Sequence, residues 1–122
     1  MSFQTEKKLV LDFYEALETS ELKNTINVFS KYCSEDLFWR GFHPFDEING
    51  RETVCKLFWK PLKSSLSSLT RRKDIFFAGE NTILGNEGIW VASMGHLMGL
   101  FDKPWLNISP TNKMIFLRYA EF

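Results

Sequence analysis

The sequence is poor in the residues that mark several common classes of protein. Its 122 residues include two cysteines and two histidines, too few for a disulfide framework or a usual zinc site. No apolar run approaches the ~18 residues of a membrane span, and the N-terminus lacks the apolar segment of a secretory signal. We therefore expect a cytoplasmic protein with reduced cysteines, Cys33 and Cys55, and with no metal or other cofactor.

The chain also has no excess of either charge. Fifteen basic and fifteen acidic residues balance, so nothing attracts the chain generally to nucleic acid or to a membrane surface, and neither is expected as a partner. The one basic run, Arg71-Arg72-Lys73, precedes Asp74 and is interpreted as a solvated strand edge. No Gly-rich phosphate loop, Gly-x-Ser-x-Gly elbow or His-Glu-x-x-His helix is present.

Aromatic residues, in contrast, are abundant. Twelve Phe, four Trp and three Tyr are many for this length, and such residues fill cores and also line ligand pockets. We expect most of them to fill the core and a subset, together with two methionines, to line a pocket for a flat, weakly polar molecule. The predicted ligand-binding residues are Trp39, Phe58, Trp59, Met94, Met98, Phe101, Trp105 and Tyr119.

Helical spacing of apolar residues dominates the first half of the chain. One helix is expected from Thr5, its N-cap, through residue 17, and a second over 22–33. Asn49 and Glu52 have the spacing of a capping box, which predicts the start of a third helix. Pro61 is expected to end or kink this helix, and the apolar stripe after it predicts a further short helical piece over residues 62–69.

The second half of the chain reads as strands. They are expected over 74–78, 89–101 and 114–122, and a short earlier strand over 37–40 leads into a loop. The helices come first, and the turns between the later strands are too short for crossover helices. The sequence therefore predicts an α+β fold with an antiparallel sheet, in a single domain of residues 1–122.

Four segments carry a resemblance to a known family: FWRGFHPFDEINGRE at 38–52, FWKPL at 58–62, GHLMG at 95–99 and PTNK at 110–113. They resemble the nuclear transport factor 2-like superfamily, and within it the SnoaL-like polyketide cyclase branch. Asn112 replaces the glycine of the Pro-Thr-Gly-Lys/Arg turn of that branch and tolerates the same left-handed conformation. The resemblance implies a cystatin-like cone, in which N-terminal helices pack on a curved antiparallel sheet and a pocket opens between them.

Members of this superfamily include isomerases, cyclases, dehydratases and non-catalytic carriers. The SnoaL-like branch has a similar Gly-His in the corresponding strand, which implies a pocket position for His96. It also implies an acidic catalytic group just after the Pro-Thr-Gly turn, where this chain has apolar residues at 114–117, so the expected carboxylate is missing. Members usually continue past the equivalent of Phe122, so either the sheet closes there or a last strand is lacking.

His96 is the first catalytic candidate. Strand alternation places it on one face with Met94 and Met98, an apolar environment that keeps the ring neutral. An imidazole suits proton transfer near neutral pH. Gly95 and Gly99 beside it leave room for a curved strand or a ligand. We expect His96 to point into the cone.

Two carboxylates are the other catalytic candidates. Glu121 shares a face of the last strand with Tyr119, and Asp46 lies in a loop with His43 and Glu47. Either carboxylate is a candidate hydrogen-bond partner for a buried imidazole, and a solvated position is the alternative for both. The loop holds too few ligands for a metal site.

Three functions remain open on the sequence alone. The first is an enzyme of the isomerase, cyclase or dehydratase type that uses His96 with Glu121 or Asp46. The second is a non-catalytic binder of a small, mostly apolar molecule, and the third is a dimerisation or protein-interaction module. The missing carboxylate favours the second over the first. In every case an exposed aromatic sheet face predicts a homodimer through the sheet.

Overall fold

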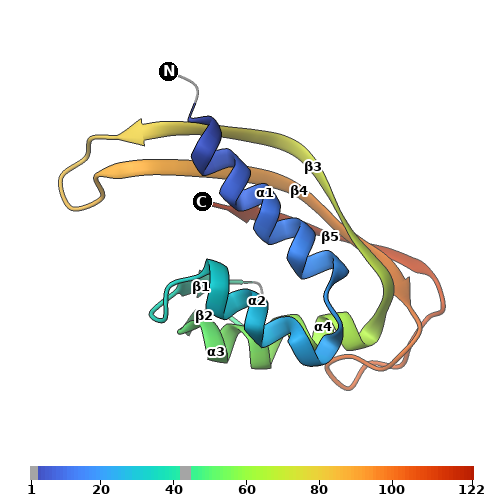
Figure 1. The fold of residues 1–122 in the computed structure, drawn as a ribbon. Coiled ribbons are helices and arrows are strands. Elements are labelled where there is room, and N and C mark those ends of the chain that lie inside the picture. The colour runs from blue at the N-terminus through green and yellow to red at the C-terminus, as the bar shows by residue number, and fades with distance from the viewer. Residues whose placement is uncertain (1–2, 42–44) are drawn as a thin grey trace.

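A mostly helical N-terminal half precedes a three-stranded sheet (Figure 1). The structure is a computed structural model that describes residues 3–41 and 45–122. No helix in these two ranges is long and apolar enough to cross a membrane. The helical elements are α1 (Gln4–Thr19), the 3₁₀ turn η1 (Leu22–Asn24), α2 (Thr25–Tyr32), α3 (Arg51–Val54), the π-helical η2 (Cys55–Trp59) and α4 (Lys60–Ser65). The strands are β1 (Phe38–Arg40), β2 (Glu47–Asn49), β3 (Leu66–Asn81), β4 (Gly88–Phe101) and β5 (Met114–Glu121).

The sheet is antiparallel, with β4 between β3 and β5. β1 and β2 pair separately as an antiparallel hairpin. The predicted α+β class is therefore confirmed, and no helix separates the strands of the larger sheet. The register places Leu97 of β4 opposite Arg71 on one side and Leu117 on the other, so these three residues share one face.

Helices cover that face, which we call the inner face of the sheet. In Figure 1 the three strands arch over the helices: α1 crosses in front of them, and α2, α3 and α4 lie below. The opposite side, which we call the outer face, carries Met94, His96 and Met98 of β4. The core between the inner face and the helices consists of Leu17, Phe29, Ile48, Val54, Cys55, Phe58, Trp59, Leu62, Leu66, Leu97, Phe101 and Trp105.

Two predicted helix caps are wrong. Gly50, not Asn49, is the residue before α3; its φ of 93° turns the chain out of β2, a conformation that glycine adopts without steric cost. Asn49 belongs to β2 and pairs with Phe38. Thr5 lies inside α1, since Phe3 precedes that helix.

Pro61 neither ends nor visibly interrupts the third helical stretch. α3, η2 and α4 follow one another without a break from Arg51 to Ser65. Proline lacks an N–H and crowds the carbonyl four residues earlier, and the wider π turn lies directly before it. The stretch then ends at Ser65. Residues 66–73, predicted as helix and connection, belong to β3 because they pair with β4.

The turn before β5 has the expected conformation. Asn112 has φ of 58°, in the left-handed region. Its N–H donates to the carbonyl oxygen of Phe101 at 2.8 Å, and the N–H of Phe101 donates to that of Lys113 at 3.0 Å. These bonds close the loop onto the end of β4 and bring β5 into register beside it.

Candidate functional site

An arginine, a glutamate and a tyrosine from three elements meet on the inner face. Arg71 lies on β3, Glu121 on β5 and Tyr14 on α1. Nη1 of Arg71 lies 2.5 Å from Oε1 of Glu121, and the Tyr14 hydroxyl donates to the same oxygen at 2.7 Å. The side chain of Arg71 is 5% exposed and that of Glu121 is 31% exposed. The cation of this ion pair is therefore buried, while its anion keeps partial access to water.

Aromatic rings surround the guanidinium of Arg71. Its Cζ lies 3.6 Å from the ring centroid of Tyr14, 4.4 Å from that of Tyr119 and 5.7 Å from that of Trp59. These are distances at which a cation is attracted to an aromatic ring. The hydroxyl of Tyr119 is in turn hydrogen-bonded to the Ser93 hydroxyl at 2.9 Å. Packing and hydrogen bonds therefore fix the position of the arginine.

Strand alternation explains why these side chains converge. Residues two apart along a strand share a face, so Arg71 shares its face with Leu69, and Glu121 shares its face with Tyr119. Across the sheet Glu121 pairs with Ser93 of β4. The site is thus built from the inner faces of all three strands, with α1 lying across them.

Gly95 of β4 lies between the positions that face Arg71 and Glu121. A Cβ added there would lie 1.9 Å from the backbone oxygen of Arg72, so the two strands are too close for any side chain. The register between β3 and β4 also shifts between Lys73 and Ile75, and such irregularities bend a strand. Of the two roles predicted for this glycine, the curved strand is the one the geometry requires.

The pKa values of the cluster follow from its burial and its charges. Burial raises the pKa of the Tyr14 phenol above its ordinary value, and the charge of Glu121 raises it further, against a smaller opposing effect of Arg71. Burial disfavours the charge on Arg71, but Glu121 and the two tyrosines outweigh that effect and raise its pKa. Tyr14 is therefore a neutral hydrogen-bond donor and Arg71 a permanent cation.

Cys33, at the end of α2, belongs to the same neighbourhood. Burial raises the pKa of its thiol to about 11, and the charge of Glu121 contributes to the increase. A thiol of this kind stays protonated at neutral pH and is a poor nucleophile. Cys33 is partly buried and packs against the core, so we assign it to packing and not to the chemistry of the site.

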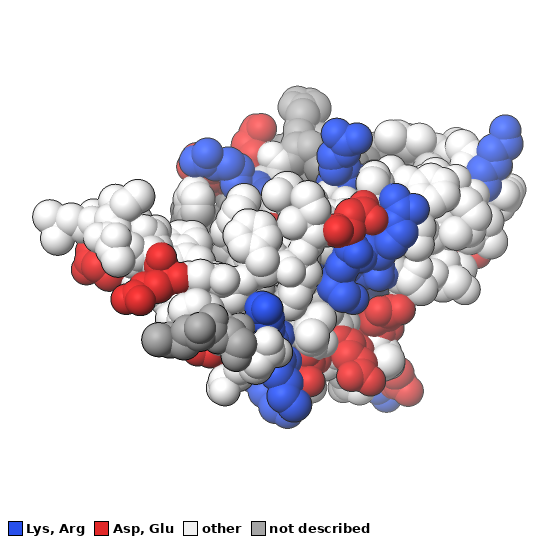
Figure 2. Space-filling view, turned by 90° about the horizontal axis from the view of Figure 1, so that it is seen from above, with Lys and Arg blue, Asp and Glu red and all other residues white. Residues whose placement is uncertain are grey.

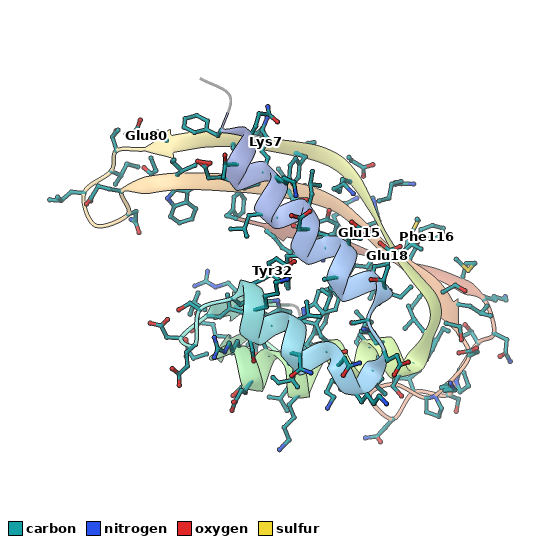
Figure 3. The ribbon with its side chains drawn as sticks, in the orientation of Figure 1. Lys7, Glu15, Glu18, Tyr32, Glu80 and Phe116 are labelled. Atoms are coloured by element: carbon teal, nitrogen blue, oxygen red, sulfur yellow. The ribbon has the colours of Figure 1, made fainter. Side chains whose placement is uncertain are left out.

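A small pocket adjoins Arg71. Its volume is about 20 Å³, room for roughly one water molecule. Glu18 is exposed on α1 at the rim (Figure 3). Apart from Glu18, Thr70 and the ion-pair cluster, the walls are apolar. The pocket is lined by Tyr14, Leu17, Glu18, Trp59, Leu69, Thr70, Arg71 and Leu97.

Four of the predicted ligand-binding residues lie elsewhere, in the aromatic core. The ring of Phe58 packs at 4.7 Å from that of Trp39 and at 6.4 Å from that of Trp105. Phe101 is buried in the same core. These rings contact one another and do not line the pocket beside Arg71. Of the predicted ligand-binding residues, Trp59 and Tyr119 are the two that lie at the ion pair.

His96 lies on the outer face, so the prediction that it points into the cone is wrong. Its Nδ1 is 3.0 Å from Nη2 of Arg72 and 3.2 Å from Oδ2 of Asp74. The predicted neighbours Met94 and Met98 share this face with it. The alternation of side chains along β4 was predicted correctly. Which of the two faces packs against the helices was not, because both faces of this strand are apolar.

Asp46 is exposed at the connection between β1 and β2. Its φ is 50°, and its carbonyl oxygen accepts a hydrogen bond from the N–H of Gly41 at 2.7 Å. Glu47 forms an exposed ion pair with Arg40 at 3.0 Å, and His43 lies outside the described residues. Within 3–41 and 45–122, no three His, Cys, Asp or Glu side chains are grouped as metal ligands.

Sequence reasoning missed Arg71, Tyr14 and Ser93. The interpretation of residues 71–73 as a solvated edge is wrong for Arg71, which is buried. The signal that could have found it is its spacing of two from Leu69, which puts both on one face of a strand. Three consecutive basic residues masked that alternation.

The fold is similar to that of a protein of known structure. No family model matches the sequence, and no curated protein is significantly similar to it. The structure is similar to the crystal structure of a protein from Jannaschia sp. CCS1, provisionally named a SnoaL-like polyketide cyclase; the TM-score is 0.65 at 18% identity, over 91% of this chain and 69% of the other. This match confirms the predicted fold, a SnoaL-like arrangement of helices on a curved antiparallel sheet.

Proposed function

We propose that this chain binds a small, mostly apolar molecule between α1 and the inner face of the sheet, with Arg71, Glu121 and Tyr14 at the polar end of the site. The observation that carries the proposal is the buried guanidinium of Arg71 beside an apolar pocket. Desolvating an ion pair costs free energy that apolar side chains of similar volume would not cost. Recognition of a ligand accounts for an ion pair in this place.

The pocket walls indicate the character of the ligand. Leu17, Leu69 and Leu97 provide apolar contacts, which suit an apolar body. The volume of about 20 Å³ is far below the ~300 Å³ of an ordinary ligand pocket. Binding therefore requires side chains of α1 to move away from the sheet, and a small ligand is favoured.

The arrangement favours binding over acid–base catalysis. Oε1 of Glu121 already accepts two hydrogen bonds, one of them from a neutral phenol. His96 and Asp46, the other two predicted acid–base groups, lie on other parts of the fold. Of the three predicted acid–base groups, Glu121 alone lies at the site and would have to carry catalysis of the isomerase, cyclase or dehydratase type.

Two aromatic probes of the same shape test this function. Isothermal titration calorimetry would measure binding of 1-naphthoate and the neutral 1-naphthamide, and native mass spectrometry would detect any molecule retained through purification. Leu69→Trp fills the pocket and should abolish binding. Leu84→Trp adds the same ring at a hairpin position that is 93% exposed, and it should leave binding intact. If wild-type protein binds neither probe at millimolar concentration and retains no molecule, the proposal is wrong.

We also propose a homodimer through the outer face, because that face exposes large apolar side chains. Phe116 is 58% exposed and projects from β5 away from the helices (Figure 3). Patches of this kind favour association. Figure 2 shows a mixed group of basic and acidic side chains within a largely uncharged surface. The exposed apolar residues of the outer face are Ile75, Phe77, Trp90, Met114 and Phe116.

The charges of the outer face are suited to a two-fold pair. Arg72 and Asp74 lie beside His96, and Arg118 is its register partner on β5. Since both signs are present on one patch, a two-fold axis can bring Asp74 of one protomer near a basic residue of its partner. Sedimentation velocity should show a dimer that Phe116→Lys converts to monomer and that Leu22→Lys, an exposed change on η1, leaves unchanged. A wild-type monomer at all accessible concentrations would contradict this proposal.

The proposed location is the cytoplasm. Cys33 and Cys55 are both free, as is usual in a reducing compartment. Fractionation of cells that express the tagged chain would test the location.

A further inference from the structure

Arg71 is held in a fixed position on the inner face. Its guanidinium is planar and presents its N–H groups in a fork that matches a carboxylate. The rings of Tyr14 and Tyr119 lie 3.6 and 4.4 Å from its Cζ, and its side chain is almost fully buried. It cannot turn into water without leaving these rings. Whatever anion meets Arg71 must therefore come to it.

The anion that meets Arg71 in this structure is much less constrained. Glu121 is the last residue of β5, an edge strand, and nearly a third of its side chain is exposed. Its one pairing partner in the sheet is Ser93, at the end of the β4–β5 ladder. A change of its side-chain rotamer would bring the carboxylate into water without opening the core.

We propose that the site takes a small monocarboxylate with an apolar body, and that the carboxylate of this ligand replaces that of Glu121 on Arg71. This inference rests on the proposed function and adds to it the chemical class of the ligand and the protein group that the ligand displaces. Glu121 then acts as an internal substitute that keeps the arginine paired while the site is empty.

Charge balance favours an exchange of one carboxylate for another. If a neutral molecule displaced Glu121, the guanidinium would stay buried without an anion, which is strongly unfavourable. A carboxylate restores the charge-assisted hydrogen bond that Glu121 made. The ligand body then lies against Leu17, Leu69 and Leu97. Glu18 at the rim is exposed, so water screens its repulsion of an approaching anion.

The chain offers a matched control for this exchange. Arg40 and Glu47 form a second Arg–Glu pair at 3.0 Å, on the β1–β2 hairpin, and both side chains are more than half exposed. Glu47→Gln makes the same chemical change as Glu121→Gln at a site with no pocket, and Arg40→Gln likewise matches Arg71→Gln.

Calorimetric titration of 1-naphthoate and 1-naphthamide into each variant tests the inference. In Glu121→Gln the competing carboxylate is gone, so naphthoate should bind about tenfold more tightly than to wild type and about tenfold more tightly than the amide does. Glu47→Gln and Arg40→Gln should match wild type. Arg71→Gln should lose the preference for naphthoate over the amide. If Arg71→Gln does not fold, the comparison of Glu121→Gln with wild type still tests the inference.

The outcomes separate this inference from the proposed function. If Glu121→Gln binds the amide as tightly as naphthoate, the site binds apolar molecules without selecting a carboxylate, and only the inference fails. If naphthoate binds Glu121→Gln no more tightly than wild type, the displacement of Glu121 is wrong. If no variant binds either probe, both proposals fail.

Discussion

Arg71 and Glu121 connect the two edge strands of the sheet across the inner face of its middle strand. Their 2.5 Å contact joins residues 50 positions apart in the chain, and β4 lies between the strands that carry them. The close approach of β4 at Gly95, which has no side chain, leaves this inner face clear between them. The same pair therefore links the two edge strands of the curved sheet and marks the polar end of the candidate site.

Removal of the charge on Glu121 should destabilise the fold. Glu121→Gln leaves the buried guanidinium with a neutral acceptor, and we expect the free energy of unfolding to fall by about 2 kcal/mol, the usual contribution of a hydrogen bond to a charged group. Urea titration measures the change. Glu47→Gln breaks an exposed pair and should cost about 0–1 kcal/mol. Equal effects of the two changes would contradict the structural role of the inner pair.

Gly95→Ala should be strongly destabilising. The added methyl would lie 1.9 Å from the backbone oxygen of Arg72, so the strands must separate, and overpacking of this kind costs about 1–3 kcal/mol or more. Gly79→Ala is the control, because nothing lies within 4 Å of its added methyl. Thermal unfolding should show a large drop in Tm for the first variant and little change for the second. A tolerated Gly95→Ala would show that β4 does not need this close approach.

The thiol of Cys33 should lose its proton only at a pH well above the ordinary pKa of a cysteine. The native pKa is about 11, against an ordinary value of 9.0. Alkylation by iodoacetamide, which requires the thiolate, should therefore rise with a midpoint near pH 11 in the folded protein and near pH 9 in urea. The folded state keeps a proton that the unfolded state loses, so this contribution to stability is complete below pH 9 and is lost as the pH rises towards 11. Cys33→Ser is the control, since it leaves only the buried Cys55; a native midpoint near pH 9 would refute the prediction.

His96→Gln should leave ligand binding unchanged. The ring contacts Arg72 and Asp74 on the outer face, and the sheet separates it from Arg71. Calorimetric affinity for 1-naphthoate should equal that of wild type, whereas Arg71→Gln should abolish the preference for the carboxylate. A loss of affinity in His96→Gln would restore the histidine to the site.

The sequence was sufficient for a helical first half followed by an antiparallel sheet, but it missed β2, whose residues were predicted as a loop, and the first part of β3. Apolar spacing of three and four gave α1 and α2, and alternation with short connections gave β4 and β5, because these signals are local. The face of β4 was not predictable in the same way. Met94 and Met98 on one face and Leu97 and Phe101 on the other are all apolar, so hydrophobicity alone does not say which face the helices cover.

The candidate site was predicted in part for a related reason. Glu121, Tyr119 and Trp59 were identified by residue type and parity, but their partner Arg71 was not. Contacts between residues 50 or more positions apart depend on strand register, which no local pattern contains. Asp46 was a candidate because it lies in a loop with two other titratable residues, but the structure places it exposed at the connection between β1 and β2.

The π-helical segment η2 accounts for two consecutive buried rings. Phe58 and Trp59 are each 4% exposed, yet neighbours on an ordinary α-helix point about 100° apart. The wider turn changes the rotational phase of the helix, so Phe58 reaches the aromatic core and Trp59 reaches Arg71. Deletion of one residue between 55 and 59 would rotate α3 by about the same angle relative to α4. The exposed hairpin tip at Leu84 would accommodate such a change in length. In η2 the same change would move Trp59 away from Arg71 or Phe58 out of the aromatic core.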